Sequence, residues 1–315
     1  MSADGPPRPL DVPRYDELNV RDPHEVRTVL LAGASANLAA ACRHGSIDIV
    51  HAGDSERLIA TGDLHDNALH LGRLVRAAAL EDASDAEAPA HLTLHEVIHG
   101  GTAEGFDKEL DFSYRALVRV ASLKARHPEH VHTLLANHEL SQIVGAGVMK
   151  DGVNFVRAFN DAVDFSFGDE SVQVREAIAE FIRSMPLALR FVTPAGVVQC
   201  SHSVPGPDLL DRFDPDVLER DLTEEDYAPR RGSAHIMVWG RNQTPDFMKA
   251  LGERWGVSLF VLGHEQADEG VLEVAPNTVV LNSDHARGAY LEIHAASIPA
   301  SAAELGDRVR RLGIA

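Results

Sequence analysis

The stretch RLIATGDLH, residues 57–65, decides the fold, because it carries an apolar strand directly into a glycine, a carboxylate and an imidazole. Gly62 permits the sharp turn that presents Asp63 at the end of the strand, and His65 follows two residues later. Apolar residues at helical spacing then cover 67–80, which predicts a helix packed on a sheet. A strand, a turn and a helix in this order are typical of α/β folds, whose ligand sites lie beyond the strand ends.

Three further motifs place the same types of side chain directly after apolar segments. Because the loops past strand ends form the ligand crevice of an α/β sheet, we expect these residues to converge in space. The motifs are His95-Glu96 after 92–94, Asn137-His138-Glu139 after 130–136, and a two-part motif with His202 after 197–201 and Gly263-His264 after 257–262.

The rest of the chain predicts an α/β layered fold in which the second half is rich in strands. Residues 1–24 are polar and contain several prolines, which predicts an arm, and 25–315 are expected to form one domain. Residues 203–233 are rich in Pro, Asp, Glu and Arg and form a candidate lid loop. Helices are predicted at 26–42 and 112–127, and further helices follow the strand at 130–136 as far as residue 184. Strands are predicted at 46–50, 187–193, 197–201, 235–239, 257–262, 271–274, 278–281 and 289–293.

Charge and composition exclude several classes of protein. The chain has 48 acidic and 29 basic residues, a net charge of −19, so its surface should repel a nucleic acid polymer. It has no apolar run long enough to cross a membrane and no secretory pattern near residue 1. Cys42 and Cys200 match no disulfide or zinc-ribbon spacing, which predicts buried thiols in a cytoplasmic protein.

The residue types at the strand ends favour a particular group of metals. Carboxylates, imidazoles and a carboxamide oxygen suit Mn, Fe or Zn, whereas a structural zinc site would usually contain thiolates. Taken singly, each motif has a simpler interpretation: Asp63 or Asn137 as a helix cap, His202 or His264 as a hydrogen-bonded histidine. The ordered set of motifs favours a metal site over these alternatives.

The order Asp-x-His, carboxylate, Asn-His-Glu, His, Gly-His resembles the calcineurin-like metallophosphoesterase superfamily, and within it the Ser/Thr protein phosphatase-like branch. The resemblance spans about residues 57–294. It implies a two-sheet β-sandwich flanked by helices, in four layers. It also implies a phosphoesterase in which a hydroxide bridging two divalent or trivalent transition metal ions attacks phosphorus.

The resemblance also assigns roles to residues. One metal ion would be held by Asp63, His65 and Glu96, and the other by Glu96, Asn137, His202 and His264. His138 would protonate the leaving oxygen or orient the phosphate. Arg241, in Val238-Trp239-Gly240-Arg241, would clamp the phosphate through two hydrogen bonds.

The chain departs from the family pattern where the family has Gly-Asp-x-x-Asp-Arg-Gly and this sequence reads HEVIHGG, residues 95–101. Glu96 would bridge the metals with one extra methylene, and His99 replaces the Asp that pairs with the catalytic imidazole. Gly100 replaces a phosphate-binding Arg. His95 and His99 are open to interpretation as residues that orient ligands, as extra ligands or as space-filling side chains. Asp107 or Asp111 is a candidate for the missing carboxylate.

We therefore expect a metal-dependent phosphatase, related to protein phosphatases and acting on a phosphorylated protein. One alternative is a hydrolase of a small phosphorylated metabolite or nucleotide, such as a dinucleoside polyphosphate. Another is a degenerate member that binds metal or phosphate without turnover, because the Asp-Arg pair is replaced by His99 and Gly100. The sequence leaves the physiological substrate, the native metal pair and the oligomeric state open.

Overall fold

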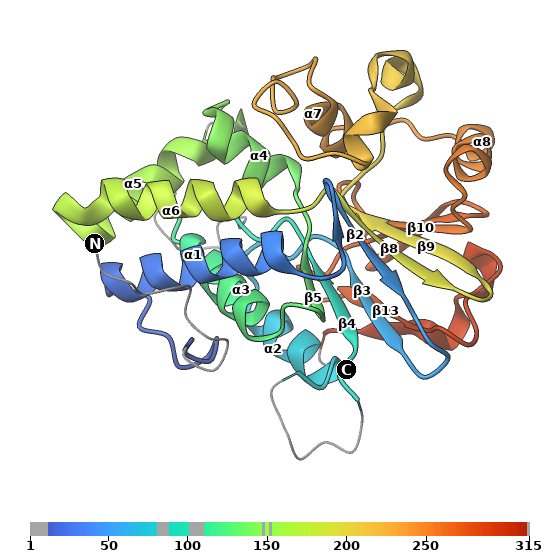
Figure 1. The fold of residues 1–315 in the computed structure, drawn as a ribbon, viewed down its shortest axis with the longest axis horizontal. Coiled ribbons are helices and arrows are strands. Elements are labelled where there is room, and N and C mark those ends of the chain that lie inside the picture. Colours follow the sequence, from blue (N-terminus) through green and yellow to red (C-terminus); the bar gives the residue numbers. More distant parts are fainter. Residues whose placement is uncertain (1–11, 81–87, 101–109, 147–148, 151–152, 314–315) are drawn as a thin grey trace.

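Two β-sheets packed face to face form the centre of the molecule, and helices cover their outer sides (Figure 1). This computed structural model describes residues 12–80, 88–100, 110–146, 149–150 and 153–313. The predicted fold class, an α/β sandwich of two sheets flanked by helices, is confirmed.

The larger sheet has seven strands, and three adjacent strands in it are parallel. β8 and β9 form an antiparallel hairpin, while β9, β10 and β12 end at the same edge. The strand order is β1 (Arg43–His44), β2 (Ile47–His51), β8 (Ala188–Thr193), β9 (Gly196–Ser201), β10 (Leu259–Leu262), β12 (Thr278–Leu281) and β11 (Val271–Ala275).

The smaller sheet has five strands, and its three parallel strands also end at one edge. The strand order is β14 (Val309–Arg311), β13 (Ala289–His294), β3 (Arg57–Thr61), β4 (His91–Leu94) and β5 (Val131–Thr133). A separate pair, β6 (Met149–Lys150) and β7 (Val153–Asn154), lies before the fifth helix.

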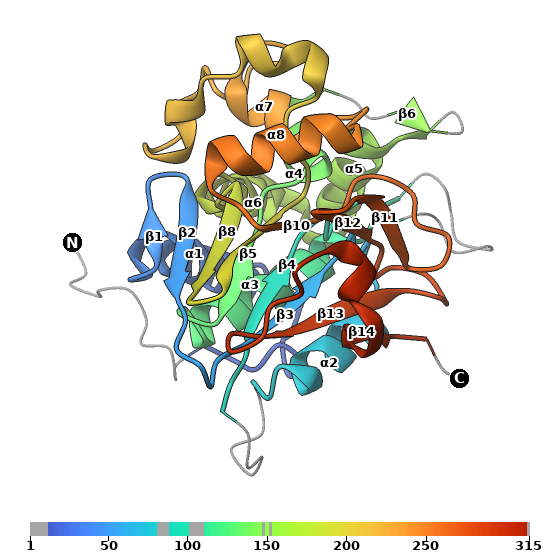
Figure 2. The same cartoon turned by 90° about the vertical axis from the view of Figure 1, so that its right-hand side faces the viewer.

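Side chains that alternate in direction along each strand produce two core layers, one between the sheets and one beneath the helices. In β10, Leu259 and Val261 belong to the core between the two sheets, whereas Phe260 packs under α8 (Pro245–Trp255) on the outside of the larger sheet. Successive side chains of a strand point to opposite faces, so an uninterrupted apolar strand serves two cores. Figure 2 shows α8 lying across one side of the sandwich and β13 and β14 on the other.

The remaining helices cover the smaller sheet and pack against one another. α1 begins after Asp22, whose carboxylate accepts hydrogen bonds from the His24 and Glu25 backbone N–H groups. α1 packs on both α3 and α6. The helices are α1 (Pro23–Ala39), α2 (Ala68–Ala77), α3 (Tyr114–Arg126), α4 (Asn137–Val144), α5 (Phe155–Phe167) and α6 (Ser171–Ser184).

The strand predicted at 235–239 is wrong, because this segment belongs to the short helix α7 (Ser233–Val238). Ile236, Met237 and Val238 are all buried. Three consecutive apolar residues show neither the 3.6-residue repeat of a helix nor the two-residue repeat of a strand, so the sequence pattern does not distinguish the two. α8 is an element that the sequence reading missed. It begins at Thr244-Pro245 and ends at Gly256, which are common start and stop signals.

Two segments concern the predicted domain organisation. Residues 12 and 13 lie against α3, because Arg126 donates to the Val12 carbonyl and the Ser122 hydroxyl to the Pro13 carbonyl. The first eleven positions of the expected arm lie outside the described residues. In the candidate lid 203–233, Arg220 pairs with Asp226. The arm, the single domain and the lid remain predictions. In the described part of the chain, no helix is long and apolar enough to cross a membrane.

Candidate metal centre

The strand-end motifs meet where the parallel edges of the two sheets come together. Asp63 follows β3, His95 and Glu96 follow β4, and His202 and His264 follow β9 and β10. Asp63 forms isolated parallel bridges both with His95 of its own sheet and with Asn282, which follows β12 of the other sheet. The convergence predicted for residues far apart in sequence is therefore present.

The tightest cluster consists of Glu96, Asn137, His202 and His264, which we call the inner cluster. The Nε2 atom of His202 lies 2.6 Å from Asn137 Oδ1, 2.9 Å from Glu96 Oε2 and 3.0 Å from His264 Nδ1. All four side chains are buried, the most accessible being His264 at 8% exposure. Their facing atoms are lone-pair donors, and a single proton cannot satisfy them all. A cation fits this arrangement.

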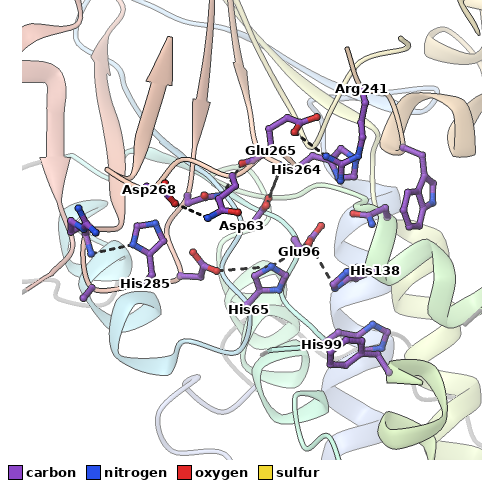
Figure 3. Close-up of a pocket in the computed structure, with 18 residues that line it drawn as sticks. Asp63, His65, Glu96, His99, His138, Arg241, His264, Glu265, Asp268 and His285 are labelled. Carbon is purple, nitrogen blue, oxygen red and sulfur yellow. Dashed lines mark hydrogen bonds and ion pairs between the residues drawn. The ribbon is translucent and has the colours of Figure 1, made fainter. Parts of the chain in front are cut away.

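The other oxygen of Glu96 faces a second group of donors. Glu96 Oε1 lies 3.3 Å from His65 Nε2 and 3.7 Å from His138 Nδ1. Figure 3 shows Glu96 between these two imidazoles. One carboxylate thus faces one cluster with each of its oxygens, as a bridging ligand between two cations must.

Asp63 contacts a different pair of histidines. Its Oδ1 atom lies 3.3 Å from His202 Nδ1 and 3.4 Å from His95 Nδ1. Its carboxylate also accepts hydrogen bonds from the His264 backbone N–H, at 3.1 and 3.0 Å. The simpler interpretation of Asp63 as the cap of α2 is wrong, since Asn67 holds that position and accepts from the His70 N–H.

Charges within the site depend on burial and on the opposing groups. Burial raises the pKa of Asp63, but hydrogen bonds and charge from His202 outweigh it, so the pKa lies well below its usual value. Burial lowers the pKa of His202, but Glu96 and Asp63 together raise it to about 10. Without a cation, a protonated His202 therefore offsets only one of the two buried carboxylate charges. A divalent ion would displace that proton and take over the balance.

The backbone around the ligands is held in unusual conformations. His65, Glu96, His99 and His264 all have positive φ, at 43°, 45°, 58° and 68°. Such left-handed conformations cost energy for residues other than glycine and persist only where surrounding contacts impose them. Here the Glu96 carbonyl accepts from the His65 N–H at 2.8 Å.

Glu139 holds the loop that follows Glu96. This fully buried carboxyl group accepts hydrogen bonds from the Val97 and Ile98 N–H groups, at 2.7 and 3.2 Å. Burial, together with the nearby charge of Glu96, raises the pKa of Glu139 to about 7. The Glu of the Asn-His-Glu motif thus supports the loop carrying Glu96, and its contacts are with backbone.

His138 packs against His99, which stands where the family pattern has an aspartate. The ring centroids are 5.2 Å apart, and within the described residues the buried Nδ1 atom of His138 has no hydrogen-bond partner, Glu96 Oε1 lying 3.7 Å away. Burial lowers the pKa of His138 and lowers that of His99 to about 3. Of the candidate replacements for the carboxylate, Asp111 accepts from the Ser113 N–H at the start of α3, and Asp107 lies outside the described residues.

Arg241 is held at the rim of the site by an acidic neighbour. Its Nη1 atom lies 2.9 Å from Glu265 Oε2, and the arginine side chain is 47% exposed. Trp239 turns its ring edge to face His264, with centroids 5.9 Å apart. Both Arg241 and Trp239 line the cavity that Glu96, Asn137 and His264 of the inner cluster also line, whereas His202 is fully buried.

The cavity over the site has a volume of about 910 Å³ and includes residues that the sequence reading missed. Asp284 is one of them, with its Oδ2 atom 4.0 Å from His65 Nε2. It follows β12, so the same strand-end pattern could have identified it. In Figure 3, Asp268 and His285 lie across the cavity from His138. Further lining residues outside the predicted set include Phe155, Gln266 and Arg287.

Solved structures with the same fold include phosphatases. A protein serine/threonine phosphatase from Saccharomyces cerevisiae, with similarity to human phosphatase PP5, superposes with a TM-score of 0.63 at 12% identity, covering 89% of this chain and 86% of that one. A cold-active protein-tyrosine phosphatase of a psychrophile, Shewanella sp., gives 0.54 at 14% identity, covering 80% and 78%. At these identities the likeness confirms the expected resemblance as a likeness of fold. No protein-family model matches the sequence, and no curated protein does.

Proposed function

We propose that this chain is a metal-dependent phosphatase that hydrolyses phosphate monoesters at a centre of two transition metal ions. The observation that carries the proposal is the position of Glu96, whose two carboxylate oxygens face separate donor groups at 3.3 Å and 2.9 Å. Nitrogen and oxygen donors without thiolates suit Mn, Fe or Zn. The inner cluster would hold one ion, and Asp63, His65 and Glu96 the other.

Two bound cations would polarise the phosphoryl group and lower the pKa of a water molecule. The chain's own groups would then place the substrate. His138, beside Glu96 and at the cavity wall, is positioned to donate a proton to the leaving oxygen. Arg241 would bind phosphate oxygens through its planar guanidinium after exchanging Glu265 for the substrate.

The charge of the cavity supports a monoester of a protein side chain over a polyphosphate. Beyond the proposed ligands, its lining includes the carboxylates of Glu265, Asp268 and Asp284. Arg241 is paired with Glu265 and Arg287 with Glu269, so both cavity arginines are already partly neutralised. A dinucleoside polyphosphate would place several additional negative charges near these groups, and like charges at short range repel.

The test combines metal analysis with a substrate panel. Protein purified from metal-replete growth should contain up to two transition metal ions per chain. It should hydrolyse phosphoserine, phosphothreonine or phosphotyrosine peptides faster than nucleotides or dinucleoside polyphosphates. Metal binding without turnover on any phosphoester would identify a binding protein instead, and a preference for polyphosphates would favour the nucleotide alternative. Protein that binds no metal would refute the proposal.

A further inference from the structure

His95 occupies the position where the family pattern has a glycine, and it contacts two proposed metal ligands. The side chain is 2% exposed, and its Nδ1 atom lies 3.3 Å from His202 Nδ1 and 3.4 Å from Asp63 Oδ1. Room for the ring depends on Gly263, because a Cβ atom there would come within 2.6 Å of His95 Cε1. His95 is therefore built into the centre.

The hydrogen bonds around His95 determine where its proton lies. Its Nε2 atom is 3.0 Å from the Thr61 carbonyl oxygen, which can only accept a hydrogen bond. The Nε2 atom must therefore carry the proton, which leaves a lone pair on Nδ1 in the neutral ring. This lone pair faces His202 Nδ1, the one N–H donor among its two neighbours there.

The proton on His202 Nδ1 in turn determines what His202 Nε2 can do. With Nδ1 protonated in a neutral ring, Nε2 presents a lone pair, and it is this atom that faces Asn137, Glu96 and His264 at 2.6–3.0 Å. Metal-binding histidines commonly donate their second ring N–H to a fixed acceptor, which sets the tautomer and the ring orientation. His95 and Asp63 are the two acceptors available to His202 Nδ1.

We propose that His95 is a positioning residue that holds His202 in the tautomer able to bind a metal ion through Nε2. This inference rests on the metal site of the proposed function, but does not require phosphoester turnover. The alternative, that His95 Nδ1 and His202 Nδ1 bind a cation together with Asp63, would move the His202 proton to Nε2. That proton would then point at the lone pairs of the inner cluster and remove His202 from it.

The experiment compares His95→Ala with His95→Asn in full-length, zinc-loaded protein. An asparagine Oδ1 can occupy the place of His95 Nδ1 and accept from His202, whereas alanine cannot. Zinc affinity is measured by competition with a chelator, and the protonation of each ring nitrogen by ¹⁵N NMR of histidine-labelled protein. His91→Ala serves as the control, since His91 is buried in β4, the strand that His95 follows, but pairs with His132 at 3.1 Å.

We expect His95→Ala to lower zinc affinity about 10- to 100-fold, the usual effect of losing a partner that orients a ligand. His95→Asn should recover most of this loss, and His91→Ala should leave zinc affinity unchanged. In the wild type, His202 should be protonated on Nδ1 with zinc on Nε2. If His95→Ala binds zinc as tightly as the wild type and His202 keeps the same tautomer, the inference is overturned. Zinc bound to Nδ1 of His95 in the wild type would overturn it as well. This second measurement needs no variant, so it decides the question even if the variants fail to fold. Zinc binding of this kind without phosphatase activity would refute only the proposed function.

Discussion

The imidazole of His99 lies against that of His138, with the ring centroids 5.2 Å apart, where the family pattern places a carboxylate. His99 Nε2 contacts Gln142 Oε1 at 3.2 Å, and Gln142 in turn donates to Asn160 at 2.8 Å. The proton of His99 is therefore on Nε2, pointing away from His138. Phe155 stacks on both rings, at 5.8 and 6.3 Å. Among the described residues, His138 is therefore held by ring packing against His99 and Phe155 and by its contact with Glu96, 3.7 Å from its Nδ1 atom.

We expect His99→Ala to reduce kcat while changing KM little. Removing the ring leaves space into which His138 can rotate, so the proton donor would spend less time in its productive orientation. Because a general acid typically contributes a factor of about 10²–10⁴ in rate, partial loss of its orientation should lower kcat at least about tenfold. Steady-state kinetics on a phosphopeptide measures this. The control Gln142→Glu, which keeps an acceptor for His99 Nε2, should retain kcat more fully. An undiminished kcat in His99→Ala would show that His99 only fills space.

Replacing two neighbouring carboxyl groups by amides should separate metal binding from loop support. Glu96→Gln removes the proposed bridging charge and should reduce bound metal from about two ions to one or none per chain. Glu139→Gln keeps an oxygen that can accept from Val97 and Ile98, and should retain the metal. Elemental analysis of both purified variants provides the measurement. If the two variants lose metal equally, Glu96 has no special role as a ligand.

The strand-end pattern in the sequence predicted more of the site than of its surroundings. It predicted that Asp63, Glu96, His202 and His264 converge, and they do, because parallel strands bring their ends to one edge irrespective of sequence distance; their role as metal ligands stays a prediction. The same pattern after Thr278–Leu281 would have identified Asp284. The pairing of His95 with His202 could not be predicted, since it depends on the space left by Gly263, which follows β10 in the other sheet.

Short apolar runs were predicted correctly at some places and wrongly at another, because such runs have no period that separates a buried strand from a helix. Arg57–Thr61 and Thr278–Leu281 match the predicted strands residue for residue. The run Ile236, Met237 and Val238 predicts a strand because three consecutive apolar side chains show no helical repeat, but it lies in the helix α7 with all three side chains buried. The positive φ angles of Glu96 and His99 could not be predicted either, because tertiary hydrogen bonds impose them on residues that avoid this conformation.

Replacing Arg241 and replacing Glu265 should change the affinity for a phosphorylated substrate in opposite directions, although either substitution breaks the ion pair between them. Arg241→Ala should raise KM for a phosphopeptide about tenfold, because it removes a charge-assisted contact with phosphate. Glu265→Gln should lower KM, since the arginine would no longer be neutralised by its neighbour 2.9 Å away. Kinetics at two salt concentrations should show a weaker salt dependence of KM in Arg241→Ala than in the wild type. Equal KM values in all three proteins would place Arg241 outside the substrate site.

Acid should destabilise the protein through a buried histidine that lies outside the metal site. Burial, with His132 and His130 as neighbours, lowers the pKa of His91 to about 3. Between this value and the ordinary 6.5, the unfolded chain binds a proton that the folded chain does not. The contribution of His91 is therefore complete above pH 6.5 and declines as the pH falls, by up to about 2 kcal/mol at pH 5.

Urea unfolding in the presence of a chelator, at pH 5, 6, 7 and 8, measures this dependence without interference from metal binding. His91→Phe should make the curve between pH 5 and 6.5 less steep by the contribution of His91, while buried His99, whose pKa is also lowered to about 3, maintains part of the slope. His51→Phe, which replaces an exposed histidine at the end of β2, should leave the curve unchanged. Glu56 lies 3.8 Å from His91 Nε2 but is 42% exposed, so solvent weakens its opposing effect. An unchanged slope in His91→Phe would assign the pH dependence to other groups.

The arginine of the family pattern cannot be restored at position 100, because the backbone leaves no room for a side chain. A Cβ atom on Gly100 would lie 2.7 Å from the His65 carbonyl oxygen and 3.0 Å from Asp66 Cβ. Gly100→Ala should therefore destabilise the protein by about 1–3 kcal/mol and weaken metal binding, because His65 must shift. Gly72→Ala adds the same methyl group in α2, where the nearest atom is 3.5 Å away, and should stabilise the helix by up to about 1 kcal/mol. Gly100→Arg should fail to improve phosphate binding. If instead it folded stably and lowered KM, the close contact between residues 65 and 100 would not be required, and the missing arginine would be a loss of function that a single substitution repairs.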